Sequence, residues 1–387
     1  MAEYKMVRLG DVCEIQSGGT PSRSKTEYWK DGTIPWVKIG DFSGKYLDKT
    51  TEHITQQGLD NSSAKLFSKG TILYSIFATL GEATILNIDA TTNQAIAGIK
   101  IKDKSSVDID YFYSFLKSLK DEVNRIGRGV AQNNINLSIL KSFFIPLPPL
   151  ETQKQIAAQL DKCTAVIAKH KQMLEKYATL IKSRFIEMFG DNPTENGKWN
   201  IEKIEDVCDL ITDGTHKTPN YQQKGIRFIS AKNIINGKID LTDTKFITEE
   251  EYKQIQKRCR VEKNDVLLTK SGSLGSSAII DFDIPIGLFE SLAVIKYKRN
   301  LLNGIFVKEL LSAESSQKQF NNGVKGIAIK HLHLNVIAAL KIPIPPIKLQ
   351  NDFASFVQQI DKSKFAVQKS LEKAETLYKS LMQRYFA

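Results

Sequence analysis

The chain has 387 residues, of which 41% are hydrophobic and 25% charged, a composition typical of globular proteins with sizeable cores. Its 54 basic and 43 acidic residues give a net charge of +11, which suggests a polyanionic partner such as nucleic acid, although many basic proteins bind none. No apolar run approaches the ~20 residues of a membrane span, the N-terminus lacks an apolar signal core, and the four cysteines form no Cys-x-x-Cys pair, so we expect a cytoplasmic protein with no membrane segment and no zinc site.

Residues 1–145 predict a mixed α/β domain. Alternating apolar runs rich in β-branched and aromatic residues indicate strands, and clusters of small residues indicate turns between them. We expect a helical turn over residues 9–15 that ends at Gly18-Gly19, a strand over 34–42, and two strands joined by a small-residue loop over 69–85. Another strand over 93–102, a helix over 107–126 and a glycine-bearing polar segment over 127–140 follow.

A long helix is predicted over residues 146–190. Three prolines, Pro146, Pro148 and Pro149, end the preceding element, because proline lacks the N–H of a strand or helix. About forty residues without glycine or proline follow, which makes a helix roughly 60 Å long, and it ends at Gly190. Apolar residues recur every three or four positions along one face: Ile156, Leu160, Cys163, Ile167, His170, Leu174, Tyr177, Ile181, Phe185 and Met188.

The second half repeats the first. Asp206-Val207-Cys208 aligns with Asp11-Val12-Cys13, and each strand pattern of the first domain has a counterpart in residues 191–342. A second proline segment then leads into a helix over residues 343–387. Its apolar face contains Phe353, Phe356, Ile360, Val367, Leu371, Ala374, Leu377 and Leu381.

These patterns predict an α+β fold in which two mixed α/β domains are separated by two long antiparallel α-helices that form a coiled coil, with an internal pseudo-two-fold repeat. Antiparallel packing follows because a parallel pair would need both domains at the same end. Five apolar side chains lie beside the predicted line of contact between the two helices. They could pack between the helices or form a surface for partner proteins: Leu180, Phe185, Phe365, Leu371 and Tyr378.

Catalytic motifs are missing from the sequence. It contains no GxGxxG, no GxxxxGK[ST], no HExxH and no convincing nuclease carboxylate set, so we expect no catalytic residue. Cys13 and Cys208 have apolar neighbours and are interpreted as small core residues rather than reactive thiols. His331 and His333 could bind a metal as a pair, but the favoured interpretation is that they lie at a strand edge or in a DNA-facing loop. No metal site is therefore predicted.

Polar loops are the feature that suits recognition. Arg, Lys, Asn and Gln read base edges in the major groove, and loop lysines and serines hold phosphates. Each loop could also be an ordinary solvated turn. The candidate DNA-binding residues are Thr20, Lys38, Asp41, Ser75, Thr79, Gln94, Arg128, Gln132, Asn133 and Asn134 in the first half, and Lys217, Lys232, Asn233, Lys270, Ser271, Ser273, Lys325, Lys330, His331 and His333 in the second.

The proline segments and the helices behind them, IPLPPLETQKQIAAQLD and IPIPPIKLQNDFASFVQQID, resemble the conserved regions of the specificity subunit of type I restriction–modification systems. The strand IPWVKIGDF and the segments KGTIL and KNDVLL resemble its target-recognition domains. The likeness covers nearly the whole chain, twice and in order. The usual Glu-Gln pair after the prolines is altered to Glu151-Thr152-Gln153 and, further from the pattern, to Lys348-Leu349-Gln350.

The resemblance implies that the two domains bind the halves of a split asymmetric sequence in double-stranded DNA and that the helices set the gap. It implies no cofactor in this chain. Two modification subunits would dock on it and supply S-adenosylmethionine-dependent adenine methylation, and a restriction subunit would add ATP- and Mg-dependent cleavage. The chain would then be no enzyme itself. A coiled-coil protein whose domains bind other proteins, and a stand-alone enzyme, remain the alternatives.

Overall fold

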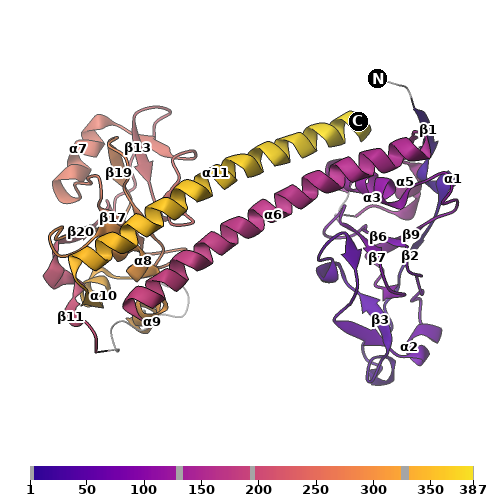
Figure 1. Ribbon diagram of the computed structural model, residues 1–387, viewed down its shortest axis with the longest axis horizontal. Helices are drawn as coiled ribbons and strands as arrows, with labels where there is room; N and C mark the ends of the chain where they lie inside the picture. Colours follow the sequence, from indigo (N-terminus) through magenta and orange to yellow (C-terminus); the bar gives the residue numbers. More distant parts are fainter. Residues whose placement is uncertain (1–3, 128–133, 192–196, 324–330, 387) are drawn as a thin grey trace. The chain divides into compact units, whose positions relative to one another are not determined.

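The computed structural model describes residues 4–127, 134–191, 197–323 and 331–386, and it divides into two compact units (Figure 1). Unit 1 consists of Met1–Lys171 together with Lys369–Ala387, and unit 2 consists of Gln172–Gln368. Each unit contains one α/β domain and a part of each long helix. The predicted α+β class and the internal repeat are confirmed by the elements described below.

Unit 1 is built on a five-stranded and a three-stranded sheet. The larger sheet has the order β2-β9-β6-β7-β4, with bounds Cys13–Ser17, Ile96–Ile101, Ile72–Ser75, Ala83–Leu86 and Tyr46–Leu47. The smaller sheet has the order β5-β3-β8, with bounds Glu52–Ile54, Ile34–Val37 and Thr91–Thr92. The other elements are β1 (Lys5–Arg8), α1 (Leu9–Val12), η1 (Thr26–Tyr28), η2 (Ile39–Asp41), α2 (Gln56–Asp60), α3 (Ile109–Ser118), α4 (Lys120–Gly127), α5 (Leu137–Ser142) and β10 (Phe144–Leu147).

Unit 2 repeats this plan. Its larger sheet has the order β12-β20-β17-β18, with bounds Cys208–Asp213, Leu292–Tyr297, Val266–Thr269 and Ser277–Ile279. Its smaller sheet has the order β16-β13-β19, with bounds Lys245–Ile247, Ile226–Ile229 and Ile286–Leu288, and β13 pairs parallel with β19 as β3 does with β8. The other elements are β11 (Asn200–Lys203), η3 (Ile204–Val207), η4 (Ala231–Asn233), β14 (Ile234–Ile235), β15 (Lys238–Ile239), α7 (Glu249–Arg258), α8 (Gly304–Ser312), α9 (Glu314–Gly323), α10 (Leu334–Ala338) and β21 (Lys341–Ile344).

Three local predictions are wrong. Cys13 begins strand β2 instead of continuing the helical turn, because residues 13–17 pair with β9. The single helix expected over 107–126 is two helices, α3 and α4. The first proline does not end the preceding element: Pro146 lies within β10, opposite Met6 of β1, and the strand ends at Leu147, directly before Pro148 and Pro149. Proline is tolerated there because β10 pairs with β1 alone and its other edge needs no N–H.

The long helices are α6 (Leu150–Phe189) and α11 (Ile347–Phe386) (Figure 1). They begin four residues later than the predicted boundaries at 146 and 343, because the strands β10 and β21 come first. No helix in the described parts of the chain carries an apolar stretch that could cross a bilayer.

The helices are antiparallel within each unit, as predicted. In unit 1 the Tyr385 hydroxyl donates to Gln159 Oε1 at 2.6 Å, and Lys171 Nζ lies 3.1 Å from Glu375, so positions rise along α6 as they fall along α11. The same order holds in unit 2, where the rings of Phe189 and Phe353 are 5.5 Å apart and α6 contacts α11 again one turn further on through an Arg–Phe pair.

Most of the predicted apolar stripe faces inward. Leu160 is buried in the core of unit 1 and Phe185 in that of unit 2. Leu377 is an exception at 53% exposure, because its neighbour Tyr378 takes the inward position. Among the side chains predicted beside the line of contact between the helices, Leu180 and Phe365 are exposed. Phe185 and Leu371 are buried, and Tyr378 is partly buried against the core of unit 1.

A buried glutamine fastens the start of each long helix to its α/β domain. In unit 1, Gln153 is fully buried, its Oε1 accepts from the backbone N–H of Asp108 at 2.9 Å, and its Nε2 donates to the carbonyls of Ser106 and Pro148. The Asp108 side chain in turn caps α3. One side chain therefore joins the proline turn, the helix α6 and the N-terminus of α3.

Unit 2 repeats the arrangement with Gln350. Its Oε1 accepts from the N–H of Asn303, the N-cap of α8, at 2.9 Å, and its Nε2 donates to the carbonyls of Leu301 and Pro345 at 3.0 and 2.7 Å. The fixed geometry between helix and domain in each unit follows from this pair of equivalent glutamines.

We predict that Gln153→Leu lowers the free energy of unfolding by about 3 kcal/mol, because it leaves one N–H and two carbonyls without their partner in a buried site. Gln155→Leu is the matched control, since Gln155 is exposed on the same helix and its loss should change stability by less than about 0.5 kcal/mol. Urea unfolding followed by circular dichroism measures both; equal effects of the two substitutions would contradict the role of Gln153.

Candidate nucleic-acid interface

Four chain segments meet at one end of the larger sheet in each unit. In unit 2 they follow β12, join β17 to β18, precede β20 and precede α10. Backbone hydrogen bonds tie them together: Thr215 N–H to Leu288 C=O at 2.9 Å, Lys270 N–H to Ser291 C=O at 2.8 Å, and Leu332 N–H to Lys270 C=O at 2.8 Å. We call residues 213–217, 270–276, 289–291 and 331–332 loop cluster 2.

Unit 1 makes the same three bonds at equivalent positions. Gly19 N–H donates to Thr92 C=O at 2.8 Å, Ile76 N–H to Ala95 C=O at 2.9 Å, and Ile135 N–H to Ile76 C=O at 3.0 Å. We call residues 17–20, 76–82, 93–95 and 134–135 loop cluster 1. The two clusters therefore share a backbone, and four pairs of residues occupy matching places: Thr20 and His216, Ile76 and Lys270, Gln94 and Glu290, Asn134 and His331.

The loop after the central strand is held by its own hydroxyl. In unit 1, Ser75 Oγ donates to the carbonyl of Thr79 at 2.5 Å and accepts from the N–H of Glu82 at 2.8 Å. Thr269 makes the matching bonds to Ser273 and Ser276 in unit 2. Ser75, predicted as a DNA-binding residue, is fully buried. Its hydroxyl shapes the loop instead.

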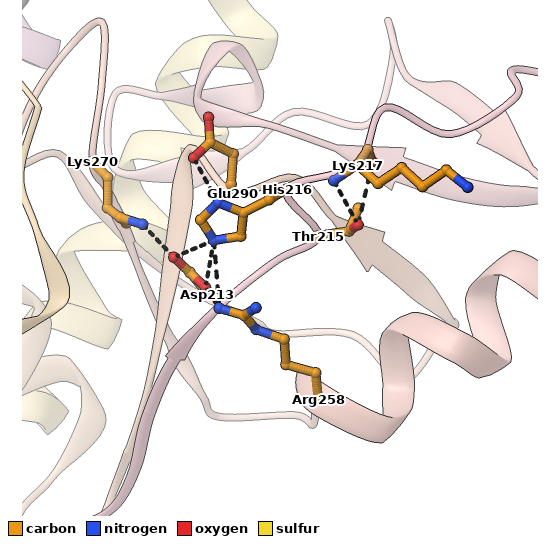
Figure 2. Close-up of polar contacts among 7 residues, drawn as sticks. All are labelled: Asp213, Thr215, His216, Lys217, Arg258, Lys270 and Glu290. Atoms are coloured by element: carbon orange, nitrogen blue, oxygen red, sulfur yellow. Dashed lines mark hydrogen bonds and ion pairs between the residues drawn. The ribbon is translucent and has the colours of Figure 1, made fainter.

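Loop cluster 2 is charged. Asp213 has only 2% of its side chain exposed, and Figure 2 shows Lys270, Arg258 and His216 converging on it. Lys270 makes an ion pair with one carboxylate oxygen, and Arg258 Nη2 lies 2.6 Å from the other. His216 Nε2 is 3.2 Å from Asp213, and its Nδ1 is 3.4 Å from Glu290. Three basic side chains thus surround one buried carboxylate.

The pKa of Asp213 reflects this surrounding. Burial raises the pKa of a carboxyl group, but the hydrogen bonds and charges of Lys270 and His216 outweigh burial and hold the pKa of Asp213 below its ordinary value. Lys270, predicted as a DNA-binding residue, is itself buried, and its ammonium neutralises Asp213. The partners of Asp213 that reach the surface are His216 and, beside loop cluster 2, Arg258, whose side chains are 53% and 56% exposed.

Loop cluster 1 is neutral at the same places. Thr20 Oγ1 lies 2.5 Å from Gln94 Oε1, where unit 2 has His216 beside Glu290. Thr79 and Gln94 are exposed, and Asn134 lies beside Phe77 through a backbone bridge. The structure thus brings together Thr20, Thr79, Gln94 and Asn134, as a set of uncharged donors and acceptors.

Two further residues predicted to bind DNA make hydrogen bonds within the fold. The Asp41 carboxylate accepts from the Lys38 N–H and from the hydroxyls of Thr50 and Thr51; burial raises its pKa, but these bonds lower it overall. Asn233 is buried and its amide joins Ser230, Asp240 and Asp243. Both side chains therefore stabilise loops; Asn233 is buried, whereas Asp41 is half-buried and keeps part of its surface accessible.

The remaining candidate DNA-binding residues are exposed, half-buried or outside the described part of the chain. Lys38 pairs with Glu52, and Lys232 pairs with Asp243 at 3.2 Å while 51% exposed. Lys217, Ser273 and His333 are exposed, and Ser271 and His331 are half-buried. Burial, followed by the charge of Lys270, lowers the pKa of His331. Five predicted residues lie outside the described part of the chain: Arg128, Gln132, Asn133, Lys325 and Lys330.

Sequence reasoning missed four residues of this site, Asp213, His216 and Glu290 in loop cluster 2 and Arg258 beside it. The repeat contained the signal for two of them, since His216 lies 196 residues after Thr20 and Glu290 lies 196 residues after Gln94. Arg258 ends helix α7, whose smaller counterpart in unit 1 is α2, so the repeat could not indicate it.

The interpretation of the cysteines as core residues is confirmed. Cys13 and Cys208 are buried, and burial raises the pKa of each thiol to about 12. His331 and His333 have rings 5.2 Å apart, and within the described ranges no third side chain completes a metal-binding group.

Cavities lie away from both clusters. One of about 840 Å³ in unit 2 is lined by residues of α8 and α11, and one of about 320 Å³ in unit 1 is lined near the start of α6.

Comparison with known proteins gives a consistent picture. The family model described as type I restriction modification DNA specificity domain matches residues 1–176 and again residues 196–375. The type I restriction enzyme MjaIX specificity subunit of Methanocaldococcus jannaschii is 26% identical over 382 residues, which cover 92% of this chain and 87% of that protein.

Two solved structures have a similar fold. The S subunit of a type I restriction–modification system from M. genitalium matches with a TM-score of 0.60 and 15% identity, over 99% of this chain and 96% of its own. A chain from a study of complex assembly and conformational transition of the type I R-M system matches with a TM-score of 0.60 and 16% identity, over 100% and 98%. At these identities the likeness concerns the fold alone.

We predict that Asp213→Asn lowers the free energy of unfolding at pH 7 by about 3–5 kcal/mol, because it leaves the buried Lys270 without a counter-charge. A carboxyl group with a lowered pKa stabilises the fold above its ordinary pKa and loses that effect as the pH falls through its folded pKa, so the difference from the unsubstituted chain should shrink below about pH 4.

The control is Asp209→Asn, an exposed carboxylate on the same strand, which should change stability by less than about 0.5 kcal/mol. Denaturant unfolding at several pH values checks both variants. A difference for Asp213→Asn that persists unchanged into acid would refute the ion-pair explanation.

Proposed function

Because this chain belongs to the family of type I restriction–modification DNA specificity subunits, we propose that loop clusters 1 and 2 each bind one half of a split, asymmetric DNA target. Helices α6 and α11 would set the gap between the halves. The chain is the sequence-recognition subunit of a type I restriction–modification complex, and the assignment of the two clusters to the two half-sites is our proposal.

One observation carries this assignment. The same backbone hydrogen bonds hold both clusters, yet the side chains at equivalent positions differ in charge: Thr20 and Gln94 in one unit, His216 and Glu290 in the other. Base edges are distinguished by patterns of donors and acceptors, so two clusters with different patterns would read different sequences. A target with two unlike halves is the expected result.

Electrostatics supports a DNA partner. The chain carries a net charge of +11, and phosphate contacts by lysine and arginine supply sequence-independent affinity. Exposed basic side chains lie in or beside the clusters, among them Lys217 and Arg258 in unit 2. Binding should therefore weaken steeply as salt concentration rises.

Modification subunits are the proposed partners of the helices. Leu180 and Phe365 are exposed at 44% and 61%, and apolar side chains on a helix surface suit packing against another helix. We propose that two such subunits bring S-adenosylmethionine and methylate adenine, and that a restriction subunit, where one joins, brings ATP and Mg. Double-stranded DNA and these subunits would then be the partners of a chain that catalyses nothing itself.

The rival function is a coiled-coil protein whose domains bind other proteins. It predicts no salt-dependent shift of DNA by the purified complex of this chain with its modification subunits, whereas our proposal predicts one. A stand-alone enzyme would require methylation or cleavage of DNA by the isolated chain, which we expect to be undetectable.

Exchange of residues 1–144 for the corresponding segment of a relative should change only one half of the methylated sequence. The reason is that loop cluster 1 lies wholly within the exchanged segment and loop cluster 2 lies wholly outside it. Mapping methylated adenines in DNA from cells that carry the exchanged chain and its modification subunits gives the result. A change in both halves, or in neither, would refute the modular assignment.

Insertion of four residues after Lys171, matched by four after Gln368, should lengthen both helices by one turn at the boundaries of the units. One turn adds about 6 Å, which corresponds to about two base pairs of B-DNA. We expect the preferred gap to widen accordingly while both half-sites keep their sequences. A four-residue insertion after Asp283, in an exposed loop, is the control and should leave the gap unchanged. Methylation mapping reads out both.

A further inference from the structure

The segment after Thr20 is held by two tryptophans. The indole N–H of Trp36 donates to the carbonyl of Gly19 at 3.1 Å, and that of Trp29 donates to the carbonyl of Ser22 at 3.1 Å. The two rings meet edge to face with centroids 5.0 Å apart. The backbone that leads out of loop cluster 1 is therefore fixed from Gly19 to Ser22, and Arg23 follows at once.

Arg23 is held in one orientation. Its guanidinium lies 3.5 Å from the centre of the Trp29 ring and 4.8 Å from that of Trp36. Arg23 Nη2 also makes an ion pair with Glu52 Oε2 at 2.6 Å. Glu52 belongs to β5, where it is paired in register with Trp36, so the carboxylate and the rings are parts of one small sheet.

The guanidinium is nevertheless accessible. The Arg23 side chain is 53% exposed, and beyond the ion pair it makes no hydrogen bond to any residue in the described parts of the chain. A guanidinium has five N–H donors in a planar fork. The ring contacts and the Glu52 ion pair hold the guanidinium in place, and its other donors have no partner within the described parts of the chain.

Charge near Arg23 is partly cancelled. Glu52 lies between Arg23 and Lys38, and the hydrogen bond from Lys38, with the Arg23 contact, lowers the pKa of Glu52, so the carboxylate is ionised at neutral pH. A carboxylate beside the guanidinium weakens attraction to phosphate but leaves its donor geometry intact. Fixed geometry with reduced charge favours base readout over backbone contact.

We propose that Arg23 donates in bidentate fashion to O6 and N7 of a guanine in the half-site bound by unit 1. This rests on the function proposed above. Arginine suits this contact because its fork matches the two acceptors on the major-groove edge of guanine. The contact belongs to unit 1 alone: the corresponding stretch of unit 2, residues 217–225 between His216 and β13, contains neither arginine nor tryptophan.

The test compares Arg23→Lys with the unsubstituted chain, each assembled with its modification subunits. Lysine keeps the charge but cannot form the fork. We expect discrimination for guanine at one position of the unit 1 half-site to fall about 10- to 100-fold, with the unit 2 half-site unchanged. Arg8→Lys is the matched control, since Arg8 is exposed on β1 and lies 5.4 Å from the Phe144 ring, away from loop cluster 1.

A second measurement needs no variant. Binding of the unsubstituted complex to duplex DNA in which 7-deazaguanine replaces that guanine should weaken about tenfold, because one of the two acceptors is lost. The inference would be overturned by a unit 1 half-site without guanine, by no response to 7-deazaguanine, or by equal weakening on all sequences in Arg23→Lys, which marks a phosphate contact. Failure of the proposed function is separate: the unsubstituted complex would then show no sequence-specific methylation.

Discussion

A buried side-chain amide is the constraint on which each half of the chain depends. Gln153 and Gln350 are fully buried, and the side-chain amide of each bonds to one N–H and two carbonyls. These groups belong to the proline turn and to the loop that precedes α3 in unit 1 and α8 in unit 2. An aliphatic side chain of the same size could fill the space but would leave those groups unsatisfied. The amide therefore fixes how each α/β domain is joined to its long helix, and every functional surface is placed relative to that joint.

Within each unit, backbone hydrogen bonds hold the loops in place, and the exposed side chains of the loops differ between the units. Three backbone bonds recur in both loop clusters, and a strand-end hydroxyl, Ser75 or Thr269, shapes the loop that follows. Because these bonds use main-chain groups and a buried hydroxyl, the exposed residues of the loops can change without loss of the fold. Such an arrangement allows one scaffold to present different donor and acceptor patterns.

Loop cluster 2 contains a buried ion pair where loop cluster 1 has uncharged residues. Lys270 and Asp213 are buried against each other in unit 2, whereas the matching residues of unit 1 are Ile76, also buried, and Ser17. Replacement of a buried ion pair by apolar groups is often neutral for stability, so stability does not explain the pair. Asp213 also positions His216 and Arg258 at the surface, which links the buried pair to the recognition face.

The sequence by itself determined the repeat, the strands of both domains, the two long helices and their antiparallel course, because periodicity, proline and glycine act locally and leave a pattern in the order of residues. Only the tertiary structure decided which polar residues face outward. Ser75, Asn233 and Lys270 look like surface ligands in the sequence but are buried. Burial and pairing depend on groups far along the chain: the partner of Lys270 is Asp213, 57 residues earlier, and such a contact exists only once the sheet has formed.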